Sequence, residues 1–157
     1  DGTATYFSRV LLETVLDING HKVLAFSAHF RSKSSDDPGR RFAEAQRTRE
    51  IMLARAQELP DALVVLGGDL NDVPGSDPIN AMTSNNGLLR VGADITGGLD
   101  WTYYYNGATH AIDHIMLAPN SGGSYVALSA KTVRDTNANN LAGSDHSAMM
   151  ADFTLGK

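Results

Sequence analysis

An Asn-Gly pair, Asn19 and Gly20, separates two runs rich in apolar and β-branched residues, 6–18 and 22–30. Both residues tolerate the positive φ angles that a two-residue turn between antiparallel strands requires. An Asn-Gly pair in this setting is the strongest short-range signal for a β-hairpin. The first 30 residues therefore predict a hairpin, and the fold must be built on a sheet.

A polar loop, 32–37, follows the hairpin and leads into a predicted helix. Asp37 suits the N-cap, Pro38 suits the first turn, and Pro60 ends the pattern. Apolar side chains recur at near-helical spacing in this segment: Phe42, Ala45, Met52, Leu53, Ala56 and Leu59. The charged residues between them predict a solvated helix face: Arg41, Glu44, Arg47, Arg49, Glu50 and Arg55.

A continuous apolar run, 62–66, predicts a strand buried on both faces. A loop over 67–75 and a short helix over 77–82 are expected after it. Further predicted strands and turns complete the pattern: strands at 101–105, 111–117, 125–133 and 147–155, and turns at 106–107 and 120–123. Strands with one or two helices laid on them indicate a layered α+β fold.

The composition is that of an ordinary globular protein, with 42% hydrophobic and 20% charged residues in a chain of 157. The apolar runs are too short for a membrane-spanning helix, which needs about 20 residues. The absence of cysteine excludes disulfide scaffolds, thiolate metal sites and cysteine nucleophiles. A net charge of -5 argues against nucleic-acid binding through the overall field, but it allows phosphate chemistry assisted by a divalent metal.

Polar side chains lie where the predicted strands end or interrupt apolar sequence: His29, Asp69, Asn71, Asp113, Asp145 and His146. Taken singly, most of them have a structural explanation, since Asp-x-Asn is common turn chemistry and a lone histidine is usually structural. Asp113 is the exception, because a carboxylate within an apolar strand needs a partner. Its neighbour His114 is expected to point to the opposite sheet face.

Taken together, these groups follow a defined order: His29, Gly68-Asp69-Leu70-Asn71, Ile112-Asp113-His114-Ile115 and Ser144-Asp145-His146. This order resembles the C-terminal half of the endonuclease/exonuclease/phosphatase superfamily, from about residue 23 to residue 153. The resemblance implies a DNase I-like two-layer β-sandwich flanked by helices, with only the C-terminal half, one sheet plus helices, in residues 1–157. The segments 29–33 and 67–72 look most like secreted bacterial members, so we expect a secreted or periplasmic location.

The resemblance implies a water-activating and metal-binding group. Asp69 matches the residue that orients or activates the attacking water, and Asn71 matches a residue that helps to hold this water and the phosphate. Asp145 matches a divalent-metal ligand, with Asp69 and Asn71 also expected at the metal. Carboxylate and amide oxygens suit Mg²⁺ or Mn²⁺, with Ca²⁺ as an alternative.

The resemblance also implies a phosphate-contacting group. His146 matches the histidine that contacts the scissile phosphate, and Asp113 matches the carboxylate that orients its imidazole. His29 matches a histidine that stabilises phosphate oxygens or protonates the leaving group. Arg31 and Lys33 are candidate contacts to a polyanionic substrate, with a merely solvated loop as the alternative.

The implied activity is divalent-metal-dependent hydrolysis of phosphoesters, foremost that of a nuclease cleaving phosphodiester bonds by water attack. Phosphatases and sphingomyelinase-like phospholipases of the superfamily use the same core residues and are alternatives. A catalytically silent half-domain that binds phosphate or a partner is the alternative from another class. Three consecutive tyrosines, Tyr103, Tyr104 and Tyr105, fit either stacking on a base or lipid headgroup or ordinary core packing.

The resemblance leaves the first half of the family domain unmatched. That half supplies a metal-binding glutamate and an asparagine near the phosphate. We assign neither role here, and four glutamates stay without one: Glu13, Glu44, Glu50 and Glu58. The chain is expected to be a fragment, one chain of a cleaved or split enzyme, or a dimerising half-domain. In each case an apolar sheet face awaits an N-terminal half or a second copy.

Overall fold

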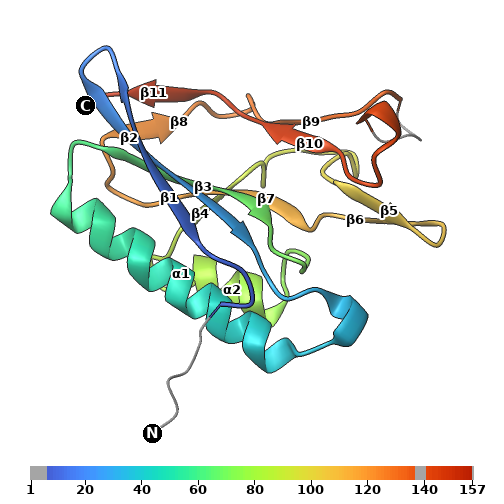
Figure 1. Ribbon diagram of the computed structural model, residues 1–157. Helices are drawn as coiled ribbons and strands as arrows, with labels where there is room; N and C mark the ends of the chain where they lie inside the picture. The colour runs from blue at the N-terminus through green and yellow to red at the C-terminus, as the bar shows by residue number, and fades with distance from the viewer. Residues whose placement is uncertain (1–6, 137–140, 157) are drawn as a thin grey trace, which may run out of the picture.

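The computed structural model describes residues 7–136 and 141–156. Its centre is a five-stranded sheet with the order β1-β2-β3-β7-β4 (Figure 1). The strands of this sheet are β1 (Leu12–Ile18), β2 (His21–His29), β3 (Leu63–Asp69), β7 (Asp113–Leu117) and β4 (Leu89–Val91). β2 and β3 run parallel, and the other neighbouring strands run antiparallel.

The predicted hairpin is confirmed. Ile18 pairs with His21, and both Asn19 and Gly20 have positive φ angles, 55° and 86°. The strand predicted from residue 6 onward, a residue outside the described ranges, becomes regular only at Leu12. The residues before Leu12 cross towards the helix layer instead, since Phe7 and Leu11 pack against its core.

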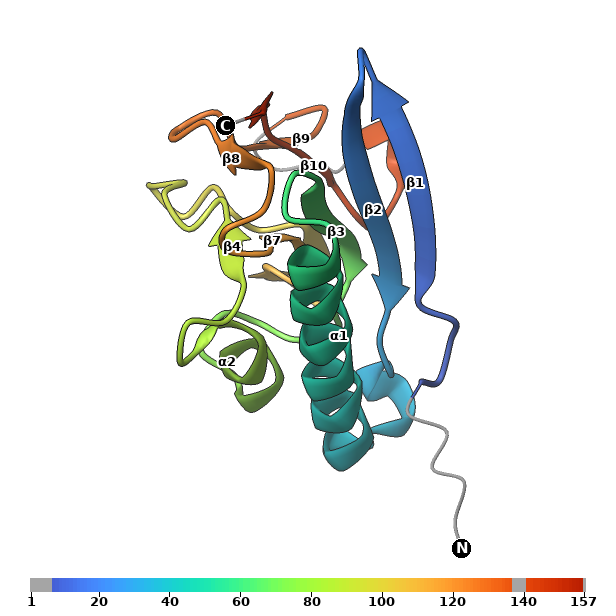
Figure 2. The ribbon, with the colours of Figure 1, turned by 90° about the vertical axis from the view of Figure 1, so that its left-hand side faces the viewer.

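The predicted long helix is α1 (Pro38–Glu58), and it connects the parallel strands β2 and β3. Asp37 caps it as expected, with its side chain accepting a hydrogen bond from the Arg40 backbone N–H. A short 3-10 helix, η1 (Lys33–Ser35), precedes α1, and the second predicted helix is α2 (Asp77–Thr83). Figure 2 shows α1 and α2 side by side on the same face of the sheet.

One feature of the predicted helix face is wrong. Arg41 and Glu44 were expected on the solvated face, but they are 3% and 0% exposed. The loop before α1 folds over this part of the helix and supplies some of their partners, while Ser8 and Asp72 come from other parts of the chain. Glu44 accepts hydrogen bonds from the backbone N–H groups of Ser8 and Arg31, at 2.5 and 2.6 Å.

The third strand is longer than predicted. Gly67, Gly68 and Asp69 were expected in a loop, but they continue β3 and pair with both β2 and β7. The glycine at 68 is required here, because a Cβ at that position would overlap the carbonyl oxygen of Ala28. The extension carries Asp69 to the last position of the strand.

A second, smaller layer covers part of the other sheet face (Figure 1). It contains two short antiparallel pairs: β8 (Gly123–Tyr125) with β11 (Phe153–Leu155), and β9 (Lys131–Val133) with β10 (Ala148–Met150). The single strands predicted over 125–133 and 147–155 are therefore wrong. The first breaks because Leu128 has a φ of 65° and its N–H donates to the Asp94 carboxylate, so that the chain turns.

Two further small elements flank this layer. The hairpin of β5 (Tyr103–Tyr105) and β6 (Ala108–His110) turns at Asn106 and Gly107, as predicted. A short 3-10 helix, η2 (Leu141–Gly143), precedes the Ser-Asp-His segment.

The two sheet faces have separate cores. Helix residues such as Ala45 and Met52 pack against Leu24 and Phe26 of β2 on one face. The second layer packs on the other face, around residues such as Leu63. On that second face, β1 leaves Leu12, Leu16 and Ile18 between 43% and 56% exposed. Among the described residues, no helix has the length and apolar character to cross a membrane.

Candidate active site

Three predicted site residues meet at one end of the central sheet. His29, Asp69 and Asp113 are direct cross-strand neighbours on β2, β3 and β7. Neighbours in register project from the same sheet face. This is the face of the second layer, because Asp69 alternates with Leu63, which belongs to that core. The strand order thus brings together side chains that lie up to 84 residues apart in the sequence.

Asp69 and Asn71 form a tight local unit after β3. The Asp69 carboxylate accepts a hydrogen bond of 2.8 Å from the Asn71 backbone N–H, and Asn71 has a φ of 53°. The Asn71 side-chain amide donates to the carbonyl of Phe30, which fixes the amide plane. Burial raises the pKa of the Asp69 carboxyl above its usual range, and the negative charge of Asp113 acts in the same direction. A carboxylate of raised pKa is a better proton acceptor for water.

His146 reaches the same place from a different part of the chain. Its Nδ1 lies 2.8 Å from Oδ2 of Asp113, which is the pairing that the sequence predicted. A carboxylate bonded to Nδ1 fixes the tautomer and direction of the ring. The other ring nitrogen, Nε2, is then left to act on a substrate. On the opposite flank, Nε2 of His29 lies 3.4 Å from Oδ2 of Asp69.

Thr102 holds the Asp113 and His146 segments together, a role that the sequence analysis missed. It is fully buried, and its hydroxyl accepts hydrogen bonds from the backbone N–H groups of Ile112 and Asp113. Its carbonyl accepts from the N–H of Ser147. The sequence gives no signal for this function of Thr102, because its partners are set by tertiary packing.

His114 and Asp72 form a support on the other sheet face, also missed. As predicted, His114 points away from Asp113, and its Nε2 lies 2.8 Å from the Asp72 carbonyl oxygen. Because Arg90 donates to Nδ1 of His114, Nε2 carries the proton in this network. Burial lowers the pKa of His114 to about 4, and the Arg90 charge acts in the same direction. The hydrogen bond from His114 to the Asp72 carbonyl therefore holds the loop that carries Asn71 from the helix side of the sheet.

Arg31 and Lys33, the predicted substrate contacts, have partners within the chain. The Arg31 guanidinium donates to the carbonyl of Ser35, and the Lys33 ammonium lies 2.8 Å from the Asp72 carboxylate. Asp72 also pairs with the buried Arg41 at 2.9 Å. Lys33 thus ties the loop to Asp72, whereas the side-chain contact of Arg31 stays within the loop. Substrate contact by either of them stays a prediction.

Glu13 and Glu44 do not take the metal-binding role of the glutamate that the family's first half supplies. Glu13 pairs with Arg55 at 2.7 Å on the helix face of β1. Glu44 is occupied by backbone N–H groups, as described above. Glu44 lies near the same end of the sheet as Asp69 but on the helix face, and neither carboxylate belongs to the group of Asp69, Asp113 and His146.

A divalent cation fits the residues at this end of the sheet. In residues 7–136 and 141–156, Asp69, Asp113 and His146 place one ligand atom each within 4.8 Å of one another. Two half-buried carboxylates this close repel each other, and a cation between them removes that cost. Their oxygens suit Mg²⁺ or Mn²⁺. Asp145 lies exposed beside this group rather than in it, so its predicted role as a ligand stays a prediction, as does that of Asn71.

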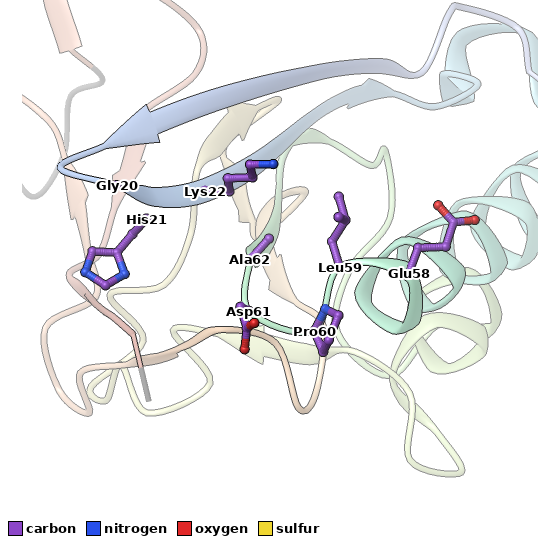
Figure 3. A pocket seen from close by; sticks show the side chains of 8 residues that line it. All are labelled: Gly20, His21, Lys22, Glu58, Leu59, Pro60, Asp61 and Ala62. Atoms are coloured by element: carbon purple, nitrogen blue, oxygen red, sulfur yellow. The ribbon is translucent and has the colours of Figure 1, made fainter.

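A pocket of about 310 Å³ lies at the opposite end of β2 and β3 (Figure 3). Its walls combine the hairpin turn with the residues that follow α1: Gly20, His21, Lys22, Glu58, Leu59, Pro60, Asp61 and Ala62. Figure 3 shows His21 and Glu58 at opposite ends of the pocket, so these titratable side chains do not converge.

The family comparison agrees with this geometry. Residues 2–146 match the model of the endonuclease/exonuclease/phosphatase family. The chain therefore belongs to this family, whose superfamily consists of metal-dependent phosphoesterases. A search among curated proteins found no match.

Solved structures confirm the DNase I-like fold. TDP2 from D. rerio, complexed with single strand DNA product, superposes with a TM-score of 0.67 at 16% identity, covering 92% of this chain and 61% of that one. The human Nocturnin catalytic domain, with a bound sulfate anion, superposes with a TM-score of 0.67 at 17% identity, covering 90% of this chain and 51% of that one. A mannosyl-6-phosphatase from Bacteroides thetaiotaomicron superposes with a TM-score of 0.59 at 18% identity, covering 87% of this chain and 53% of that one. This chain thus spans little more than half the length of these structures.

Proposed function

We propose that this chain carries the hydrolytic site of a phosphodiesterase, and that its activity is that of a nuclease. The observation that carries the proposal is the Asp113–His146 pair, set beside the partly buried Asp69 at the end of the sheet. An oriented imidazole can contact the phosphate, and a carboxylate of raised pKa can accept a proton from water, and both groups support water attack on a phosphodiester.

In this proposal, Asp69 orients the attacking water and accepts its proton while the new P–O bond forms. His146, held by Asp113, contacts the oxygens of the scissile phosphate. His29 stabilises the same oxygens or donates a proton to the leaving oxygen as the ester bond breaks. Asn71 holds the water and the phosphate in line.

Asp69, with Asp113, Asn71 and Asp145 around it, would hold a divalent cation. When bound, this cation neutralises charge on the phosphate and lowers the pKa of water, which side chains alone achieve less well. The family is generally dependent on such cations, and Mg²⁺ or Mn²⁺ is our proposal for this chain.

We also propose that further strands complete the second layer. They come from an N-terminal half, in the same or a separate chain, or from a second copy. The exposed Leu12, Leu16 and Ile18 of β1 support this, since they flank the second-layer core without being covered by it. A secreted or periplasmic location belongs to the same proposal, and it rests only on the similarity of residues 29–33 and 67–72 to secreted members.

The substrate class is tested with three esters: single-stranded DNA, p-nitrophenyl phosphate and sphingomyelin. Each is incubated with the full chain and Mg²⁺ or Mn²⁺, with chelator as the control. We expect cation-dependent cleavage of DNA, with less turnover of the phosphomonoester and the lipid. Light scattering on the same samples gives the oligomeric state. Preferential hydrolysis of the monoester or the lipid would replace the nuclease with a phosphatase or a phospholipase.

A further inference from the structure

The β5–β6 hairpin carries three consecutive tyrosines whose role the proposed mechanism leaves open. Tyr103 and Tyr105 lie on one side of β5, with ring centroids 5.9 Å apart and planes only 10° from parallel. Tyr104 lies on the other side, by the alternation of a strand. Tyr104 and Tyr105 are 47% and 57% exposed, so core packing does not account for them.

This row of rings begins at the candidate active site. The ring centroids of Tyr103 and His146 lie 4.7 Å apart, and the two residues form a β-bridge. His146, Tyr103 and Tyr105 therefore make a continuous row from the site towards the turn of the hairpin. The residue paired with Tyr105 is Ala108, whose methyl group is too small to cover the outer ring.

We propose that this row is a stacking subsite for a nucleobase next to the scissile phosphate, so that the substrate is a single-stranded nucleic acid. The inference rests on the proposed function and narrows it. Exposed tyrosine rings present flat apolar faces, and the bases of a single strand offer matching faces. In a duplex those faces are already covered by neighbouring bases.

The charge of the chain favours this mode of binding. Proteins that hold nucleic acid through its phosphates need many Lys and Arg contacts, whereas this chain has a net charge of -5. Lys33, near the site, is already paired with Asp72. Stacking requires no positive charge and tolerates any base.

A lipid surface is the competing partner for exposed tyrosines. Residues 104–109, which form the outer part of the hairpin, contain no long aliphatic side chain. Interfacial binding to a bilayer draws on buried apolar area as well as on aromatic rings. The hairpin therefore fits a nucleobase better than a membrane.

The test compares a thymidine dinucleotide with two analogues that lack the base on one or the other side of the phosphate. With Mg²⁺, we expect the chain to prefer the dinucleotide over at least one base-free analogue. Tyr105→Ala should lower kcat/KM for the dinucleotide roughly tenfold. The same variant should leave kcat/KM unchanged for the analogue that lacks the stacked base. Tyr105→Phe should retain the preference. Tyr104→Ala, an exposed tyrosine on the opposite side of β5, is the matched control and should behave as wild type.

A second experiment measures binding without turnover. A single-stranded oligonucleotide containing 2-aminopurine is titrated with the chain in the presence of chelator, and binding is followed by fluorescence. We expect Tyr105→Ala to weaken this binding roughly tenfold and Tyr104→Ala to leave it intact. If no dinucleotide is hydrolysed, the proposed function fails while this titration still decides the subsite. Equal effects of the two alanine variants would overturn the inference. Loss of binding to sphingomyelin vesicles in Tyr105→Ala, without loss of oligonucleotide binding, would overturn it as well.

Discussion

The two faces of the central sheet use polar residues differently. On the helix face, Arg41 and Glu44 are buried, and each is matched by hydrogen-bond partners within the chain. On the other face, Asp69, Asp113 and His146 are only half-buried, and their polar atoms cluster around one another. One face therefore stabilises the fold, and the other holds reactive groups together at a cost in repulsion.

Strand alternation separates the two uses within a few residues. Asp113 faces the site, whereas the next residue, His114, faces the helices and anchors the Asp72 carbonyl. Asn71 serves the site, whereas Asp72 is buried between Lys33 and Arg41. Asp113 and Asn71 thus each precede a residue that stabilises the helix side of the molecule.

The largest expected effect is the loss of hydrolysis when Asp69 becomes alanine. We expect turnover to fall by about a thousandfold or more, because the water loses its proton acceptor. Circular dichroism should remain that of the wild type, since Asp69 belongs to neither apolar core. Asp61→Ala, an exposed aspartate at the other end of β3, is the control and should retain activity. Full turnover in Asp69→Ala would show that the site assignment is wrong.

Alanine substitution of one leucine on each face tests the difference in packing between the two faces. Leu24 on the helix face is fully buried, so Leu24→Ala should lower the free energy of unfolding by about 3–5 kcal/mol. Leu16 on the other face is 43% exposed, so Leu16→Ala should cost about 1 kcal/mol or less. Urea denaturation measures both. Similar costs would mean that a second copy already covers β1 in solution.

Removal of one member of the buried ionic network should lower the free energy of unfolding nearly as much as Leu24→Ala. Arg41→Met leaves the Asp72 carboxylate buried with Lys33 as its remaining ionic partner, and we expect a loss of about 3 kcal/mol. Arg47→Met, on the same helix, breaks the exposed pair with Glu50 and should cost under about 1 kcal/mol. Thermal unfolding compares the two variants. A small loss in Arg41→Met would indicate that water reaches Asp72.

The smallest expected effect, at pH values above 5.5, is the pH dependence that His114 adds to the free energy of unfolding. Its pKa is lowered from 6.5 to about 4, so the unfolded chain binds more protons between these pH values and stability falls as the pH falls through this window. The expected loss between pH 7 and pH 5.5 is about 1 kcal/mol, rising to about 3 kcal/mol near pH 4. His114→Gln keeps a donor for the Asp72 carbonyl but does not titrate, so its stability curve should be flatter. Parallel curves for the two proteins would exclude His114 as the source.

Local rules predicted the hairpin and the capped helix correctly, because Asn19, Gly20 and Asp37 act through their immediate neighbours. The order of the motifs likewise predicted that Asp113 pairs with His146. Tertiary packing decided what local rules missed. Gly67 and Gly68 resemble a loop in sequence, yet pairing on both sides makes them strand, and Arg41 resembles a surface residue until the loop carrying Asp36 and the buried Asp72 close over it.

The most direct test of the account compares two histidines on single-stranded DNA cleavage with Mg²⁺ and with chelator. His146 lies at the proposed site, and His21, an exposed histidine, lies at the opposite end of the sheet. We predict cleavage that requires the cation, is lost in His146→Ala and is unchanged in His21→Ala. Cleavage that survives in His146→Ala, or cleavage that is as fast with chelator as with Mg²⁺, would contradict the account.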